Sequence, residues 1–204
     1  MKINIDKKTG VFAGVIVALV AVIIAMGFSN NNDGRLGMSH SSMMDSDEVS
    51  GTGQLTGADI MFLQMMIPHH QQAVDISNLA LSKSKDAELL ALATSIRDSQ
   101  ADEIIQMKQW LKDAGANIEM GHSMGDSMGG MLDEAELAAL KSASGSAFDC
   151  LWLQGMTGHH DGAIHMTQMI EDAKNVTIKE FGQAVVTAQA AQIKQMELML
   201  QRIK

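Results

Sequence analysis

Hydrophobic side chains recur every three or four residues along four long stretches of the chain, which is the spacing of the buried face of an α-helix. No stretch alternates between hydrophobic and polar residues for long enough to form a β-strand. Capping signals at Thr56 and Asp133, each with an acidic residue three positions later, mark two helix starts. The sequence therefore predicts an all-α fold, with long helices at about 56–81, 86–114, 146–173 and 177–203 and a short one at 133–145.

The turns between neighbouring stretches are short, which predicts two helical hairpins packed as an antiparallel four-helix bundle. The predicted bundle domain covers residues 56–204. Its hairpins occupy residues 56–115 and 146–204, and a linker rich in Met, His and Gly joins them at 116–132.

The two hairpins share polar as well as hydrophobic residues. The matched pairs are Asp59 with Asp149, Phe62 with Trp152, Met66 with Met156, His69 with His159, His70 with His160, Ala73 with Ala163, Gln100 with Gln189, and Met107 with Met196. Packing alone would not require a pair of histidines twice at the same place. The repeat therefore indicates a site that is built twice.

Methionine is abundant where aromatic residues are scarce: the chain has 18 Met, 5 Phe, 2 Trp and no Tyr. Methionine packs adaptably, and its thioether is also a soft metal ligand. The net charge of −9 argues against nucleic acid as a partner, because nucleic-acid binding needs a basic surface. The single cysteine, Cys150, excludes an intramolecular disulfide and a cysteine-based zinc site, and we expect it to be a small buried hydrophobic residue.

The N-terminus is typical of a membrane element. Three lysines precede a hydrophobic run at 11–28 whose length approaches the ~30 Å hydrocarbon core at ~1.5 Å per residue. Residues 1–28 are therefore predicted to form a single-pass anchor with the rest of the chain outside the cytoplasm, or a signal peptide if they are cleaved. Residues 29–55 are expected to form a flexible tether that contains Met and His.

Heptad counting places one histidine of each pair on the buried face of its helix. Folding each hairpin about its turn predicts the facing pairs His69–Gln100, Met66–Glu103, His159–Gln189 and Met156–Gln192. His70 and His160 lie about 100° further around the helix axis than His69 and His159, and they are predicted at the edge of the buried face. Imidazole, carboxylate and thioether together are plausible copper ligands, and thioether favours Cu(I). A hydrogen-bonded polar layer without metal is the alternative for each buried histidine.

Several features beside the histidines also carry expectations. Pro68 should kink or distort the first helix, and three glycines (Gly155, Gly158 and Gly162) should loosen the third. His165 forms an i, i+4 pair with Asp161, either at the surface or as an extra ligand. In the linker, three soft or imidazole donors are candidates for metal capture: Met120, His122 and Met124.

These residues resemble a known family. The pattern Asp-x-x-aromatic-x-x-x-Met-x-x-His-His-x-x-Ala, followed by Gln-x-x-Glu-x-x-x-Met, is similar to the bacterial domain-of-unknown-function family 305 over about residues 56–204. The resemblance implies a ferritin-like four-helix bundle, and some members are exported copper-binding proteins linked to copper resistance. It implies metal-binding roles for Met66, His69, His70, Glu103, Met107, Met156, His159, His160 and Met196.

The second half has Gln192 where the first has Glu103, and Gly155 where the first has Met65, so the two half-sites are expected to differ. We expect a membrane-tethered, extracytoplasmic protein that sequesters or carries copper as Cu(I) or Cu(II), with a copper-transport protein as a candidate partner. It is not expected to be an enzyme. Two alternatives are a ferritin-like metal oxidase, although no Glu-x-x-His occurs on a long helix, and a metal-free helical interaction scaffold.

Overall fold

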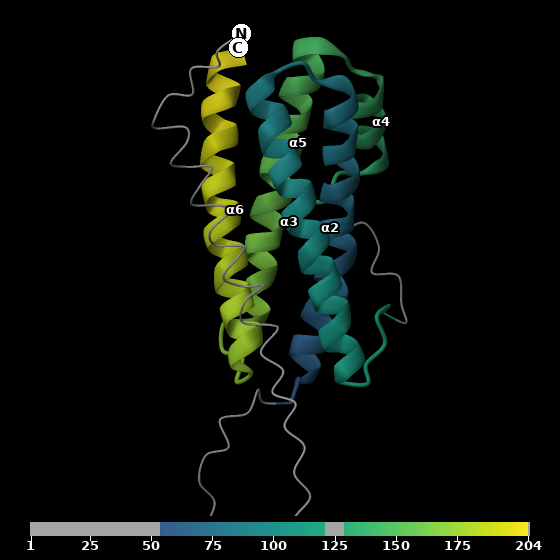
Figure 1. Cartoon of the computed structure of the whole chain (residues 1–204), viewed down its shortest axis with the longest axis vertical. Coiled ribbons are helices and arrows are strands. Elements are labelled where there is room, and N and C mark those ends of the chain that lie inside the picture. Colours follow the sequence, from purple (N-terminus) through teal and green to yellow (C-terminus); the bar gives the residue numbers. More distant parts are fainter. Residues whose placement is uncertain (1–53, 121–128, 204) are drawn as a thin grey trace, which may run out of the picture. The chain divides into compact units, whose positions relative to one another are not determined.

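The computed structural model describes residues 54–120 and 129–203. These residues form five α-helices, one 3₁₀ helix and no strand, which confirms the predicted all-α class (Figure 1). The elements are α2 (Gly57–Lys83), α3 (Ala87–Asp113), α4 (Glu134–Ser142), α5 (Gly145–Met166), η1 (Thr167–Ile170) and α6 (Val176–Ile203).

Some of the predicted features lie outside the described residues. These are the membrane anchor at 1–28, nearly all of the tether at 29–55, and His122 and Met124 of the linker. Among the helices that the structure does describe, none combines the length and hydrophobicity needed to cross a membrane.

Helix ends follow the capping signals of the sequence. The Thr56 hydroxyl accepts a hydrogen bond from the Asp59 amide, and the Asp59 carboxylate accepts one from the Thr56 amide, so both predicted partners of this capping box are present. Asp133 and Glu136 form the same arrangement at the start of α4. At the other end of α3, Gly115 adopts a positive φ of 67°, a conformation that glycine reaches without steric penalty.

Two hairpins carry the core. Helix α2 packs along α3, α5 packs along α6, and α2 also contacts α5 across the two hairpins (Figure 1). The buried hydrophobic residues form two clusters. Helices α2 and α5 contribute to both clusters. One holds Phe62, Leu63, Met66 and Ile67 with Ala163 and Met166, and the other holds Ala73, Ile76 and Ala80 with Phe148, Trp152, Leu153 and Met156. The two helices therefore run antiparallel, and the histidine pairs lie where the two clusters meet.

Two local expectations are corrected, and one stays open. The third long helix ends at Met166 rather than near Ala173 and continues as the 3₁₀ turn η1, where the Thr167 hydroxyl donates to the Ile164 carbonyl and competes with regular helix bonding. Pro68 lies inside α2, which is continuous from Gly57 to Lys83; the kink or distortion expected at Pro68 stays a prediction. Cys150 is only half-buried.

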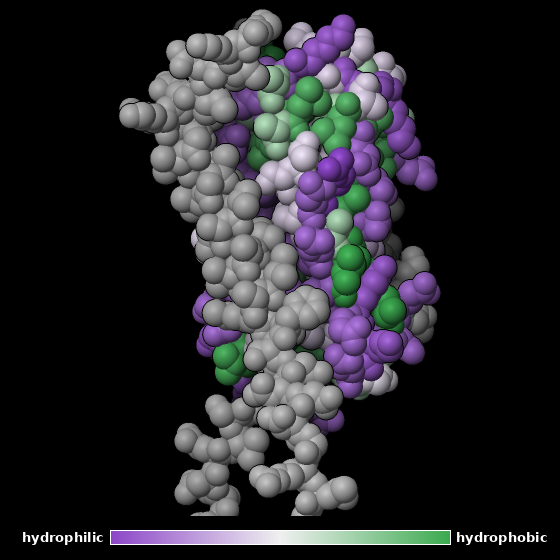
Figure 2. Space-filling model, in the orientation of Figure 1, coloured by the Kyte–Doolittle hydropathy of each residue, from purple (hydrophilic) through white to green (hydrophobic). Residues whose placement is uncertain are grey.

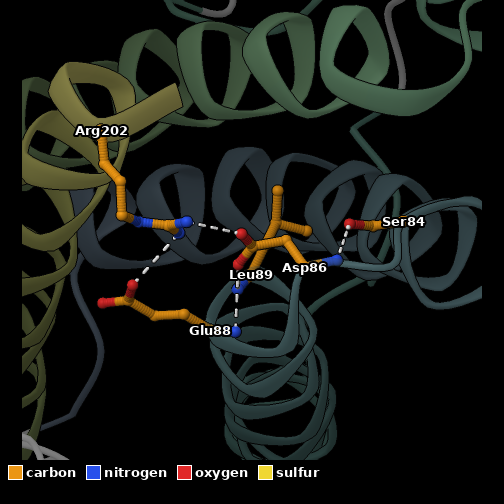
Figure 3. A network of polar contacts seen from close by, with 5 residues as sticks. All are labelled: Ser84, Asp86, Glu88, Leu89 and Arg202. Carbon is orange, nitrogen blue, oxygen red and sulfur yellow. Dashed lines mark hydrogen bonds and ion pairs between the residues drawn. The ribbon is translucent and has the colours of Figure 1, made fainter. Parts of the chain in front are cut away.

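An ion-pair network joins the end of α6 to the start of α3 (Figure 3). The Arg202 guanidinium donates to the Asp86 carboxylate at 2.8 Å and to the Glu88 carboxylate at 3.2 Å. Asp86 also caps α3 by accepting from the amides of Glu88 and Leu89. The Arg202 contact lowers the pKa of the Asp86 carboxyl below its ordinary value. This one residue therefore serves both helix capping and contact between the hairpins.

The face of the helical domain that is visible in Figure 2 is mainly hydrophilic, with some hydrophobic side chains among the polar ones. Ile105, Val176 and Leu198 are among the exposed hydrophobic residues. Scattered exposure of this kind is ordinary for a folded domain. The unusual feature is therefore inside the domain, where polar side chains are buried.

Candidate metal centre

Each pair of consecutive histidines faces two different neighbouring helices. All four imidazoles, His69, His70, His159 and His160, are fully buried. Successive residues of an α-helix are about 100° apart, and a helix with two packed neighbours buries a sector wide enough for both. His70 and His160, which were predicted at the edge of the buried face, are therefore as fully buried as His69 and His159.

The second histidine of each pair contacts the partner helix of its own hairpin. The Nε2 atom of His70 lies 2.8 Å from Oε2 of Glu103, and Nε2 of His160 lies 2.7 Å from Oε1 of Gln192. The heptad count placed Met66 and Met156 opposite these two polar residues, but the histidines make the contact. The matched contacts differ only in that one acceptor is a carboxylate and the other an amide.

The first histidine of each pair meets its counterpart between the hairpins. The rings of His69 and His159 lie with their centroids 3.8 Å apart and their planes tilted by 39°. Nε2 of His159 lies 3.1 Å from the backbone carbonyl oxygen of His69, and Nε2 of His69 lies 3.2 Å from that of Gly129 in the linker. The glutamines predicted to face these rings, Gln100 and Gln189, do not accept from them: the Oε1 atom of each is buried without a partner.

All four Nε2 atoms therefore face an oxygen that can only accept, which assigns the ring hydrogen to Nε2. In a neutral imidazole this leaves an electron pair on Nδ1. The Nδ1 atoms of the four histidines are all buried and have no hydrogen-bond partner. Unsatisfied buried polar atoms are uncommon, and four in one layer indicate a ligand that the protein side chains do not supply. Histidines that bind metals ordinarily donate the other ring N–H to a carboxylate or carbonyl, as these do.

Burial keeps three of these rings neutral. It lowers the pKa of His69 to about 3, with the neighbouring His70 adding a smaller effect in the same direction. It lowers the pKa of His160 to about 4, opposed by the hydrogen bond to Gln192. The pKa of His159 is lowered well below its ordinary value, by burial first and by His69 second. The neutral ring is the form that binds a metal.

Four of the predicted thioether ligands are fully buried in the clusters that flank the histidines: Met66, Met107, Met156 and Met196. Met66 and Met156 precede His70 and His160 by four residues and so lie on the same helix face. In contrast, His165 is exposed, and Met120 is half-buried at the edge of the described residues.

Within residues 54–120 and 129–203, no three side chains of His, Cys, Asp or Glu come together at metal-binding distance. The buried imidazole nitrogens and thioether sulfurs of this region are a soft donor set, which suits Cu(I). The orphaned Nδ1 atoms and this donor set fit a bound copper ion.

Two residues of this site were not among the predicted ones. Gly129 supplies the acceptor for His69, and Gln72 exchanges two hydrogen bonds with the backbone of Leu132 nearby. The available signal was the break in the repeat, because Gly155, Gly158 and Gly162 replace Met65, Pro68 and Gln72. These glycines do not simply loosen α5. Gly162 and Gly155 leave the space that the linker backbone and Leu132 occupy.

Known structures share this fold. A DUF305 protein from Streptomyces coelicolor has 30% identity and a TM-score of 0.68, over 72% of this chain and 93% of that one. A DUF305 fragment from Deinococcus radiodurans has 31% identity and a TM-score of 0.67, over 72% and 97%. The Cu(II)-bound form of CopM has 31% identity and a TM-score of 0.63, over 72% and 97%. CopM has also been solved with Cu(I) and with Ag.

No curated protein sequence matches this chain. The family model described as "Domain of unknown function (DUF305)" matches residues 59–200, which include both histidine pairs and both hairpins. The chain belongs to the DUF305 family.

Proposed function

We propose that this protein binds copper, as Cu(I) or Cu(II), in the buried histidine layer of a ferritin-like four-helix bundle, and that it sequesters or carries the ion. The observation that carries the proposal is the set of four buried Nδ1 atoms without partners. Buried polar atoms without partners are unfavourable in a protein interior, and bound copper would use these electron pairs. The copper-bound and silver-bound CopM structures, at about 30% identity, support the same ligand class.

The ligands would be the Nδ1 atoms of the two histidine pairs, completed by the thioethers of Met66 and Met156 and, further along, Met107 and Met196. Glu103 is proposed to act differently from the ligand role that its sequence position suggests. Its carboxylate is already the acceptor for the Nε2–H of His70, so it would orient this ring and raise the basicity of Nδ1.

The test is a Cu(I) competition titration of the full-length protein in detergent against a chromophoric chelator. The double variant His69→Gln/His159→Gln should lose stoichiometry and affinity. His165→Gln is the matched control, because His165 is exposed, and it should bind as the wild type does. Wild-type binding no tighter than that of the double variant would exclude the histidine layer as the copper site.

The enzymatic alternative is tested with the same preparation. If the protein only holds the ion, adding Fe(II) or Cu(I) should cause no oxygen consumption beyond the buffer rate. A metal-free scaffold would show no change in melting temperature with copper, whereas a ligand that binds only the folded state raises it.

The site of action is proposed to be outside the cytoplasm, with residues 1–28 as the membrane anchor. Cell fractionation tests this: the intact protein should stay with membranes after alkaline carbonate extraction, and a variant lacking residues 1–28 should not. Recovery of the intact protein in the soluble fraction would favour a cleaved signal. A copper-transport protein remains the candidate partner.

A further inference from the structure

A short segment of the linker crosses both hairpins beside the histidines. We call residues 129–132 the strap. Its carbonyl at Gly129 accepts from Nε2 of His69 at 3.2 Å. At the other end of the strap, the Gln72 side chain donates to the Leu132 carbonyl at 2.9 Å and accepts from the Leu132 amide at 2.8 Å. One glutamine therefore satisfies both backbone groups of a strap residue.

Helix α5 is shaped to receive the strap. A Cβ atom on Gly162 would lie 1.8 Å from the Gly129 oxygen and 2.9 Å from the Gly130 Cα. A Cβ atom on Gly155 would lie 3.0 Å from the Leu132 side chain. Because no side chain fits at Gly162 while the strap is in place, this close approach depends on glycine. The position that matches Gly162 in the first hairpin is Gln72. The second hairpin therefore leaves space for the strap, and the first hairpin supplies the side chain that bonds to it.

This arrangement makes the two hairpins unequal at the histidine layer. The Nε2 atom of His159 bonds to the backbone carbonyl of His69, which belongs to the long helix α2. His69 has no such helix-borne acceptor, and its Nε2 partner belongs to the strap. The ring orientation of His69 thus depends on a segment outside the long helices.

We propose that Gln72 is a positioning residue, which holds the strap so that Gly129 keeps His69 in the Nε2–H tautomer with Nδ1 available to a metal. This inference rests on the proposed copper function only for its effect on affinity. The tautomer of His69 is a property of the metal-free protein. A strap that merely packed against the helices would add stability without selecting a tautomer.

The experiment uses the full-length, metal-free protein in detergent, labelled with ¹⁵N at histidine. Two-bond ¹H–¹⁵N correlation spectra identify which ring nitrogen of each histidine carries the hydrogen. Wild-type His69 should show the Nε2–H tautomer alone. Gln72→Ala removes the hydrogen bonds to Leu132, and Gly162→Ala displaces the strap. Each variant should therefore convert His69 to a mixture of tautomers. The tautomers of His70 and His160 should stay unchanged.

Each variant has a matched control. Gln71 is exposed and bonds only to Asp75, so Gln71→Ala should leave the His69 tautomer as in the wild type. A Cβ atom on Gly158 would meet nothing within 4 Å, so Gly158→Ala tests the same substitution one turn away without displacing the strap. In Cu(I) competition titrations, Gln72→Ala and Gly162→Ala should weaken one site by about ten- to a hundredfold, the usual effect of removing a partner of a ligand.

The outcomes separate this inference from the proposed function. An unchanged His69 tautomer in Gln72→Ala and Gly162→Ala, or an equal change in the controls, overturns the role of Gln72 even if stability falls. If the tautomer responds as expected but the wild type binds no copper, the copper proposal fails and the positioning of His69 by the strap stands.

Discussion

At the scale of single residues, the chemistry of this protein depends on which oxygen each imidazole faces. A histidine buried without charge needs one acceptor for its ring N–H and one use for its remaining electron pair. Glu103, Gln192 and two backbone carbonyls provide the acceptors. The remaining electron pair, on Nδ1, has no hydrogen-bond partner at any of the four rings. Stability and metal affinity are therefore both expected to depend on these contacts.

The metal-free protein should lose stability in mild acid. The pKa values of His69, His159 and His160 are lowered in the folded state, whereas in the unfolded chain they return to about 6.5. At a pH between the folded and unfolded pKa values, the unfolded chain binds more protons than the folded protein. The folded state is therefore at its most stable, with respect to these rings, above about pH 6.5, and it loses stability as the pH falls toward 4 and 3. Each ring contributes a slope of up to about 1.4 kcal/mol per pH unit.

Urea unfolding at several pH values between about 7.5 and 5 measures this dependence, in a range where most carboxyl groups stay ionised. The His69→Gln/His159→Gln variant should show a shallower dependence, because it lacks two of the three groups. A free energy of unfolding that stays constant over the range would contradict neutral burial of the histidines.

The two half-sites should differ in affinity because of Glu103. A carboxylate that accepts from a ligand histidine makes the ring a better donor than an amide does, so the first hairpin should bind copper more tightly. Glu103→Gln should narrow the gap between the sites, and Gln192→Glu should tighten the second, each by about tenfold. Isothermal titration resolves the two sites. Equal affinities in the wild type, or a tighter second site, would show that Glu103 does not have this role.

At the scale of elements, helix ends and inter-hairpin contacts share residues. Asp86 caps α3 and pairs with Arg202 of α6 (Figure 3). The two roles can be separated, since asparagine caps a helix about as well as aspartate but carries no charge.

Asp86→Ala should therefore lower the free energy of unfolding by about 1 kcal/mol, mainly through the lost cap. Asp86→Asn should cost less than about 1 kcal/mol, because an ion pair with a half-exposed arginine contributes little. Thermal and urea unfolding compare the two variants. If Asp86→Asn destabilises as much as Asp86→Ala, the ion pair rather than the cap is the main contribution.

The elements also explain why the two halves of the sequence are not exact copies. The glycines of α5 stand where α2 has larger side chains, and the structure places the strap over them. The two hairpins therefore differ in sequence here because the strap packs against the glycines of α5, whereas on α2 it meets the side chain of Gln72.

At the scale of the whole molecule, the protein combines a buried layer with a linker rich in soft donors. Changing Met120, His122, Met124 and Met128 to serine should lower the copper stoichiometry and slow loading of the buried layer. A linker site must lose chain entropy on binding, so it should bind more weakly and exchange faster than a preformed one. Met131 is left unchanged because it belongs to the strap.

Metal analysis and stopped-flow loading measure the two effects, and the apo melting temperature serves as the control. We expect the melting temperature to change little. A large drop would show that these side chains contribute to the folded core, and the capture role would then have to be abandoned.

The sequence by itself determined the all-α class, most helix boundaries and the burial of one histidine of each pair. These depend on local signals, namely the three-to-four spacing and the capping boxes at Thr56 and Asp133, which act over a few residues. It did not reveal that α5 would end at Met166, because η1 also packs against α2 and α6, which are distant in the sequence or follow later in it.

Only the tertiary structure decided which groups meet in the histidine layer. His69 and Gly129 are 60 positions apart in the chain, and His69 and His159 are 90 apart, so no periodicity within a helix can report their contact. The heptad count assumed one inward-facing residue per turn, whereas a helix between two neighbours buries consecutive positions. The acceptor for each ring, and with it the availability of Nδ1, follows from packing between segments that the sequence pattern treats separately.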